Sequence, residues 1–321
     1  MNINEKNIKT WSTIGPRATL GMAALELARD MDNLMVLACD VSTSAGLDRF
    51  RKTYPEKYLD LGIAEQNMIG VAAGLASENF NVITTTFAPF QTMRCCEQIK
   101  VNLGYMGQKI CMVGIASGLA LGTLGYTHCC IEDVGILRSI PGITIISPAD
   151  SLETVKALEH AVKYDKPTYI RLTGSANNPM VYKKDYDFEI GKSITLKEGK
   201  DISIFSSGSM VYKSLEAAKI LESKNISTKV VNMHTIKPLD KEAVLKACES
   251  KLIVSIEEHN IVGGLGSAIA EFKSSLKKTP RQLFLGIRDT YSKGGSYKFL
   301  LEKNRLESEK IVEDILKEFN K

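Results

Sequence analysis

Short apolar runs alternate with longer helix-like stretches along most of this chain, and no other feature constrains its fold as strongly. A strand, helix, strand order predicts a mainly parallel sheet with helices on both faces. The helix over 150–164 is marked by Ser151 as a possible cap and by acidic residues in its first turn. The strands predicted in the first part are 33–40, 81–87, 109–115, 142–148 and 167–172, and the helices are 16–31, 63–77, 91–103 and 150–164.

The pattern weakens between about 173 and 200, where the sequence is polar and rich in turn residues, and this stretch is interpreted as a connector. Alternation then resumes as a second, smaller unit. We therefore expect an α/β protein of two domains, 1–180 and 181–321, each a mainly parallel sheet with helices on both faces. The second unit is predicted to have strands 201–209, 227–233, 251–259 and 281–287, and helices 210–223, 240–249 and 264–277.

Composition excludes several classes of protein. The chain has 41 basic and 37 acidic residues, and this net charge of +4 is spread too thinly to mark a nucleic-acid-binding surface. No apolar run reaches the roughly 18–20 residues of a membrane span, and the first residues lack the order of a signal peptide. Seven cysteines form neither a CxxC motif nor a zinc pattern, so we expect no metal site on cysteine and reduced thiols in a cytoplasm.

One glutamate is unexpected in its surroundings. Glu65 stands near the start of an expected helix in "YLDLGIAEQNMIGVAAGLA" (58–76), among apolar and small residues. A first-turn acid that interacts with the helix dipole, worth about 0.3–1 kcal/mol, is the simplest explanation. A carboxylate in a close-packed apolar segment requires a partner or a raised pKa, however, and a bound heteroaromatic ring nitrogen can share a proton with such a carboxyl group.

Three segments together resemble a known family. They are "DLGIAEQNMIGVAAGLA" (60–76), "TTTFAPF" (84–90) and "GYTHCCIEDVGILRSIPGITIISPADSLE" (125–153). In this order they resemble the transketolase family, and more closely the carboxy-terminal half of a transketolase made as a separate chain. The resemblance covers nearly all 321 residues. It implies a thiamine-diphosphate pyrimidine-binding domain followed by a transketolase C-terminal domain.

The resemblance also implies roles for individual residues. Glu65 would hydrogen-bond a ring nitrogen of the aminopyrimidine and favour the imino tautomer that activates the cofactor. Phe87 and Phe90 would form an aromatic wall beside that ring, although core packing is the ordinary role of two phenylalanines. His128 would face the substrate and pass a proton, or else be a hydrogen-bonded loop residue. Asp40 corresponds to a family aspartate near the cofactor.

Substrate recognition is expected at three further positions. Arg17, Ser44 and Arg171 match the family positions that hold a sugar phosphate, for which guanidinium forks and a hydroxyl are suitable donors. Each of them alone is more often a solvated or capping residue.

Departures from the family pattern also fall in the expected pocket. Leu124 replaces an aspartate that contacts a substrate hydroxyl, and Ala116 replaces a histidine at the phosphate. Met93 takes the place of a common tyrosine in the aromatic wall. These changes are expected to alter sugar selectivity.

No segment resembles the family's diphosphate site, which has a Gly-Asp-Gly motif and, further on, an asparagine that together place Mg²⁺. The glycine-rich 262–268 opens an expected helix in the second unit, and helix–sheet packing explains it better than phosphate binding. We therefore expect no metal ligands in this chain. The diphosphate and Mg²⁺ should be held by a separate amino-terminal subunit, in a two-plus-two assembly with the active site between the chains.

Three functions remain open from the sequence. The first is a split transketolase that moves a two-carbon ketol unit between sugars or sugar phosphates. The second is a relative with the same cofactor, either a 1-deoxy-D-xylulose-5-phosphate synthase or the beta subunit of a 2-oxo acid dehydrogenase. The third is a subunit without catalytic activity that regulates a partner, which the presence of Glu65, Phe87, Phe90 and His128 disfavours.

Overall fold

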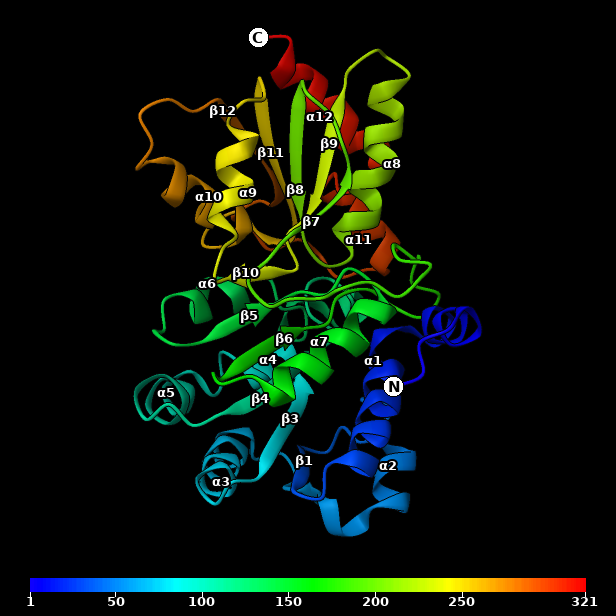
Figure 1. Cartoon of the computed structure of the whole chain (residues 1–321), viewed down its shortest axis with the longest axis vertical. Coiled ribbons are helices and arrows are strands. Elements are labelled where there is room, and N and C mark those ends of the chain that lie inside the picture. The colour runs from blue at the N-terminus through cyan, green and yellow to red at the C-terminus, as the bar shows by residue number, and fades with distance from the viewer.

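The computed structural model describes all 321 residues and shows two α/β domains, one above the other in Figure 1. The first is built on a seven-stranded sheet in the order β10-β5-β6-β4-β3-β1-β2, parallel except for β10. The predicted fold class is therefore confirmed. The strands are β1 (Leu34–Ala38), β2 (Tyr58–Asp60), β3 (Asn81–Phe87), β4 (Ile110–Ile115), β5 (Thr144–Ile146), β6 (Thr168–Arg171) and β10 (Thr235–Lys237).

Helices cover both faces of this sheet because successive strand residues point to opposite sides. Val36 of β1 packs into a core formed with α1 (Glu5–Asp30) and α7 (Ser151–Lys163). Leu37, the next residue, packs into a second core on the other face. That core contains residues of α3 (Glu65–Ser77), of the π-helical segment η2 (Ile99–Tyr105) and of α6 (Asp133–Arg138).

The second domain has a five-stranded sheet in the order β12-β11-β8-β9-β7, with β7 antiparallel. Its helices pack on both sides around two further apolar cores. The strands are β7 (Ile194–Lys197), β8 (Ile202–Ser206), β9 (Thr228–Asn232), β11 (Leu252–Asn260) and β12 (Arg281–Ile287), and the helices are α8 (Met210–Glu222), α9 (Lys241–Ala247), α10 (Leu265–Lys273), α11 (Tyr297–Lys303) and α12 (Ser308–Phe319).

The structure differs from the expected elements in several places. The first helix starts at Glu5 rather than at residue 16, with a break at Gly15 (φ 80°) where the predicted helix begins. The predicted helix 91–103 is instead α4 (Ala88–Gln91), a turn, α5 (Cys96–Gln98) and η2. The short strand β10 comes from the second half of the sequence but pairs with β5 of the first sheet, at the junction seen in Figure 1.

Candidate active site

Glu65 is the first residue of α3, and its side chain is only 4% exposed. The loop that leads to it is shaped by Asp60, whose Oδ1 accepts hydrogen bonds from the backbone nitrogens of Gly62 and Asp40, each at 3.0 Å. Within this chain, the Glu65 carboxylate has a single hydrogen-bond donor. Arg94 Nη1 lies 2.8 Å from its Oε1, and no donor of the chain reaches Oε2.

The predicted aromatic wall forms next to a histidine. Phe87 ends β3, and Phe90 lies in the short helix α4 that follows. Their ring centroids are 6.3 Å apart, and the His128 ring lies 6.1 Å from Phe87 and 5.4 Å from Phe90. The rings meet edge to face, which is a favourable arrangement for aromatic side chains. Three residues predicted from two separate segments are therefore neighbours in the structure.

Arg94 connects Glu65 to this cluster. Its guanidinium carbon lies 4.0 Å from the centroid of the Phe90 ring while Nη1 is bound to Glu65. Sequence reasoning did not single out Arg94. The one available signal was a basic residue in the turn directly after the Phe-x-x-Phe segment, and such residues are usually solvated.

The loop that carries His128 is long, and the second domain holds it in place. Within the loop, Gly118 and Cys130 exchange backbone hydrogen bonds. Glu258 of β11 accepts from the Leu119 nitrogen at 2.7 Å. The Gly295 nitrogen donates to the Gly122 carbonyl, and the hydroxyls of Tyr126 and Ser292 lie 3.0 Å apart. Sequence reasoning missed this role of Glu258, because its partner lies 139 positions away.

The Arg171 guanidinium is buried. Its side chain is 3% exposed, and its Nε lies 2.8 and 3.0 Å from the two carboxylate oxygens of Asp133. Its Nη2 donates to the backbone carbonyls of Cys130 and Glu258. Burial alone would lower the pKa of Arg171, but the adjacent Asp133 carboxylate outweighs burial and raises it. The structure therefore does not support the predicted phosphate-binding role, because the guanidinium is used to join the two domains.

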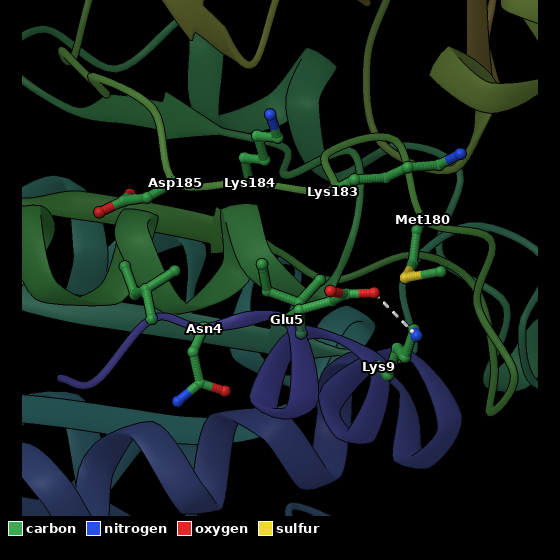
Figure 2. A pocket seen from close by; sticks show the side chains of 9 residues that line it. Asn4, Glu5, Lys9, Met180, Lys183, Lys184 and Asp185 are labelled. Carbon is green, nitrogen blue, oxygen red and sulfur yellow. Dashed lines mark ion pairs between the residues drawn. The ribbon is translucent and has the colours of Figure 1, made fainter.

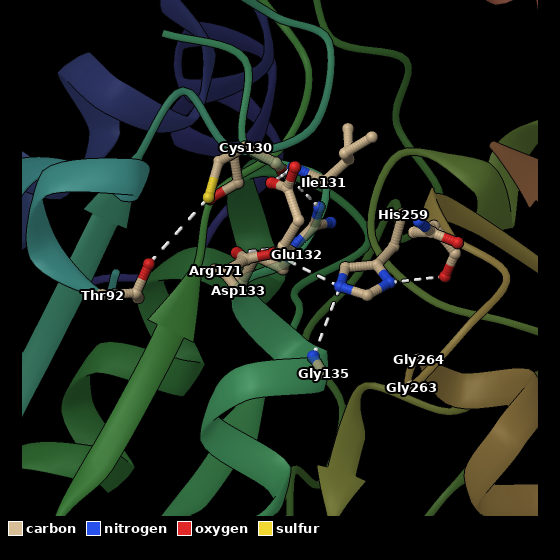
Figure 3. A network of polar contacts seen from close by, with 12 residues as sticks. Thr92, Cys130, Ile131, Glu132, Asp133, Gly135, Arg171, His259, Gly263 and Gly264 are labelled. Atoms are coloured by element: carbon tan, nitrogen blue, oxygen red, sulfur yellow. Dashed lines mark hydrogen bonds and ion pairs between the residues drawn. The ribbon is translucent and has the colours of Figure 1, made fainter. Parts of the chain in front are cut away.

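Figure 3 shows this buried network, with Arg171 beside Asp133 and the His259 ring directed toward Gly135. Burial is the main cause that lowers the pKa of His259 to about 4, so the ring is neutral at neutral pH. A neutral Nε2 can accept the hydrogen bond from the Gly135 nitrogen, which lies 3.4 Å away. The network therefore serves packing between the domains.

Arg17 and Ser44 lie on segments that touch. Arg17 follows the break in α1, and Ser44 lies, exposed, in the loop after β1. Gly46 in that loop packs so tightly against α1 that a Cβ there would lie 3.1 Å from the Arg17 carbonyl oxygen. Asp40 begins the same loop in a left-handed conformation (φ 54°) and is exposed. Leu124 is 54% exposed in the loop of His128, whereas Ala116 is buried at its start.

A surface cavity lies elsewhere, near the start of the chain. A hollow of about 580 Å³ separates the start of α1 from the connector, and none of the predicted site residues lines it. Figure 2 shows Lys9, Lys183 and Lys184 around it, with Lys9 paired to Glu5 at 2.9 Å.

No group of three or more His, Cys, Asp or Glu side chains is arranged to hold a metal ion. No helix combines the length and the apolar character that crossing a membrane requires.

Comparison with protein families shows the family to which this chain belongs. A model described as transketolase, pyrimidine binding domain, matches residues 12–178 of this chain, and one described as transketolase, C-terminal domain, matches residues 191–311. The chain belongs to the transketolase family. The buried carboxylate and the aromatic cluster lie within the part that matches the pyrimidine-binding domain.

Individual transketolase relatives agree in length as well as in sequence. A protein of Methanocaldococcus jannaschii named as a transketolase C-terminal section is 35% identical, over 96% of this chain and 97% of that protein. The 6-deoxy-6-sulfo-D-fructose transketolase subunit of Clostridium sp. (strain MSTE9) is 37% identical over 90% of this chain and 89% of that protein. An apulose-4-phosphate transketolase subunit of Phocaeicola vulgatus is 38% identical over 77% of this chain and 80% of that protein.

A solved structure described as a split gene transketolase, inactive beta4 tetramer, superposes with a TM-score of 0.86 at 34% identity. The match covers 96% of this chain and 98% of that one. This chain is thus a transferase-type subunit, the carboxy-terminal part of a split transketolase.

The family implies thiamine diphosphate, and the residues present fit its aminopyrimidine half. Glu65 offers a nearly buried carboxylate whose Oε2 has no donor from the chain. Phe90, which Arg94 links to that carboxylate, offers aromatic surface together with the neighbouring Phe87. A flat heteroaromatic ring with a nitrogen at its edge matches these two features.

Proposed function

We propose that this chain and a separate amino-terminal subunit together transfer a two-carbon ketol unit between sugars that carry an anionic group. The observation that carries the proposal is the nearly buried Glu65 carboxylate, which has one oxygen free of protein donors and is linked through Arg94 to the Phe90 ring of the cluster Phe87, Phe90 and His128. When bound, thiamine diphosphate supplies the carbanion chemistry that such a transfer requires.

The residues of this chain would contribute orientation and proton control. Glu65 holds a proton at the ring nitrogen that it meets, and a charge-assisted hydrogen bond at a site with little access to water is strong. Phe87 and Phe90 would restrict the orientation of the ring. His128 would orient a substrate oxygen and exchange a proton with it, while its Nδ1 is fixed 3.0 Å from the Thr127 hydroxyl.

An exposed surface beside the site supports a partner subunit. Ile63, just before Glu65, is 75% exposed, and Tyr105 at the end of η2 is 88% exposed. On α3, which packs against η2, a Cβ added at Gly70 or Gly74 would meet no atom within 4 Å. Exposed apolar side chains next to an open helix face are typical of an interface. We assign the diphosphate and Mg²⁺ to the partner, since this chain lacks the Gly-Asp-Gly motif, and we propose a two-plus-two assembly.

For the substrate we propose a sugar whose phosphate, or a similar anion, is held by Arg17 and Ser44. These residues lie on segments that pack together, and neither side chain has a hydrogen bond within the chain that would occupy it. Two relatives are named for a sulfo-sugar and for a sugar phosphate, both of which carry an anionic group. Leu124 leaves an apolar, half-exposed position in the loop of His128, which should limit the hydroxyl groups that the site recognises.

The free thiols support a cytoplasmic location for the assembly. All seven cysteines are unpaired, and burial is the main cause that raises the pKa of Cys39 and Cys129 to about 11. Reduced, unreactive thiols are the usual state of cysteine in that compartment.

The deciding experiment measures ketol transfer by the chain alone and mixed with its amino-terminal partner, with thiamine diphosphate and Mg²⁺. We expect activity only in the mixture, and only with ketose donors. Activity of the chain alone would contradict the assignment of the diphosphate to a partner. Turnover of pyruvate or another 2-oxo acid in place of a ketose would favour a synthase or dehydrogenase subunit, and no turnover of any donor would favour a regulatory subunit.

A further inference from the structure

Two neighbouring side chains at the start of α3 form hydrogen bonds with Arg94. Glu65 binds the guanidinium of Arg94 at 2.8 Å, and the next residue, Gln66, donates from Nε2 to the Arg94 carbonyl oxygen at 3.0 Å. The side chain and the backbone of Arg94 are therefore both tied to the same helix turn. A long side chain that is 41% exposed would otherwise sample many rotamers.

The Phe90 ring adds a third contact. The guanidinium carbon lies 4.0 Å from its centroid, within the range of a cation–π interaction. A flat guanidinium on an aromatic face has a defined plane, so the direction from which it donates to Glu65 is also defined. Arg94 thus meets the carboxylate from one side and leaves Oε2 without a donor.

We propose that Arg94 is a positioning residue for Glu65, which fixes Oε1 and thereby directs Oε2 toward the ring nitrogen of the cofactor. This inference rests on the function proposed above. A carboxylate with two equivalent oxygens can rotate about its last bond, whereas a carboxylate held at one oxygen presents the other in one direction.

Two alternative roles of Arg94 predict different effects of its loss on the binding of cofactor analogues. If Arg94 merely stabilised the fold of the turn, its loss would weaken binding of every cofactor analogue equally. If Arg94 occupied the place of the ring in the free subunit, its loss would strengthen binding of them all. Only a positioning role depends on the ring nitrogen itself.

The test compares the wild type with Arg94→Ala for two ligands, using the complex of this chain with its amino-terminal partner. Dissociation constants are measured by calorimetry for thiamine diphosphate and for an analogue with carbon in place of the ring nitrogen that meets Glu65. We expect Arg94→Ala to weaken binding of thiamine diphosphate about five- to tenfold, the scale of a partly exposed charged hydrogen bond, and to leave the analogue within about twofold. Arg94→Lys, which keeps the charge, should recover part of the loss.

Arg29→Ala is the matched control, because Arg29 forms an exposed ion pair with Glu26 on α1 at 3.2 Å and should leave both constants unchanged. The positioning role would be overturned if Arg94→Ala weakened binding of both ligands equally, strengthened binding of both, or changed neither dissociation constant. The proposed function would stand in each of these cases. If the wild-type complex bound neither ligand, the proposed function itself would fail.

Discussion

Glu258 of β11 accepts a hydrogen bond from the backbone nitrogen of Leu119 at 2.7 Å, and this bond crosses from the second domain to the loop that carries His128. The other carboxylate oxygen of Glu258 accepts from Tyr297 at 2.7 Å and from Ser209. The side chain is buried, so these donors replace the water that the carboxylate loses. The second domain therefore contributes to the site by holding one of its loops.

Replacing Glu258 with alanine should affect both stability and substrate use. Three donors lose their acceptor in a buried site, so we expect the free energy of unfolding to fall by about 3 kcal/mol, measured by denaturant titration. The apparent KM for the sugar should rise because the loop of His128 loosens, while the dissociation constant of the cofactor stays nearly constant. A variant with an unchanged KM would contradict the link between Glu258 and the loop.

Glu65→Gln keeps the shape of the side chain but loses the shared proton. In the complex with the partner subunit, cofactor binding should largely survive, while activation of the cofactor slows by about two to four orders of magnitude. Hydrogen–deuterium exchange at the reactive thiazolium carbon of the cofactor measures this step directly. Exchange at the wild-type rate would remove Glu65 from the mechanism.

Arg17 and Arg171 should behave in opposite ways. Arg171→Ala leaves the buried Asp133 carboxylate without its partner, so we expect a loss of about 3–5 kcal/mol in the free energy of unfolding. Arg17→Ala should instead leave stability nearly unchanged and raise the KM of phosphorylated sugars far above that of unphosphorylated ones. The two variants are compared by denaturant titration and by steady-state kinetics. An equal rise in both KM values for Arg17→Ala would exclude a contact with the phosphate.

Acid should destabilise the protein through its buried histidines. Burial is the main cause that lowers the pKa of His234 from 6.5 to about 4, and its Nε2 is buried without a partner. Because the folded pKa lies below the unfolded one, the neutral ring contributes stability above pH 6.5, and this contribution is lost as the pH falls toward 4.

The free energy of unfolding, measured from pH 7 to pH 4, should therefore fall less steeply in His234→Phe than in the wild type. Between pH 7 and pH 4, the wild type should lose on the order of 3 kcal/mol more of its free energy of unfolding than His234→Phe loses. His259, whose pKa is lowered in the same direction mainly by burial, remains in both proteins and accounts for part of the residual slope. Parallel curves would mean that His234 takes up no extra proton on unfolding.

The sequence alone determined the fold class and much of the candidate site. Alternating apolar runs and helix patterns are local signals, so two α/β domains could be predicted from them. Glu65, Phe87, Phe90 and His128 lie in short segments whose residue types and order are distinctive, and the last three meet in the structure as neighbours.

Only the tertiary structure decided which polar groups have partners. Arg171 has the residue type that a phosphate site requires, yet Asp133 and two backbone carbonyls occupy it inside the protein. The pairing of Arg94 with Glu65 joins positions 29 apart, and that of Glu258 with Leu119 joins positions 139 apart. A sequence pattern reports periodicity within one element, whereas the partner of a charge depends on which distant elements pack together, and burial then makes that partner obligatory.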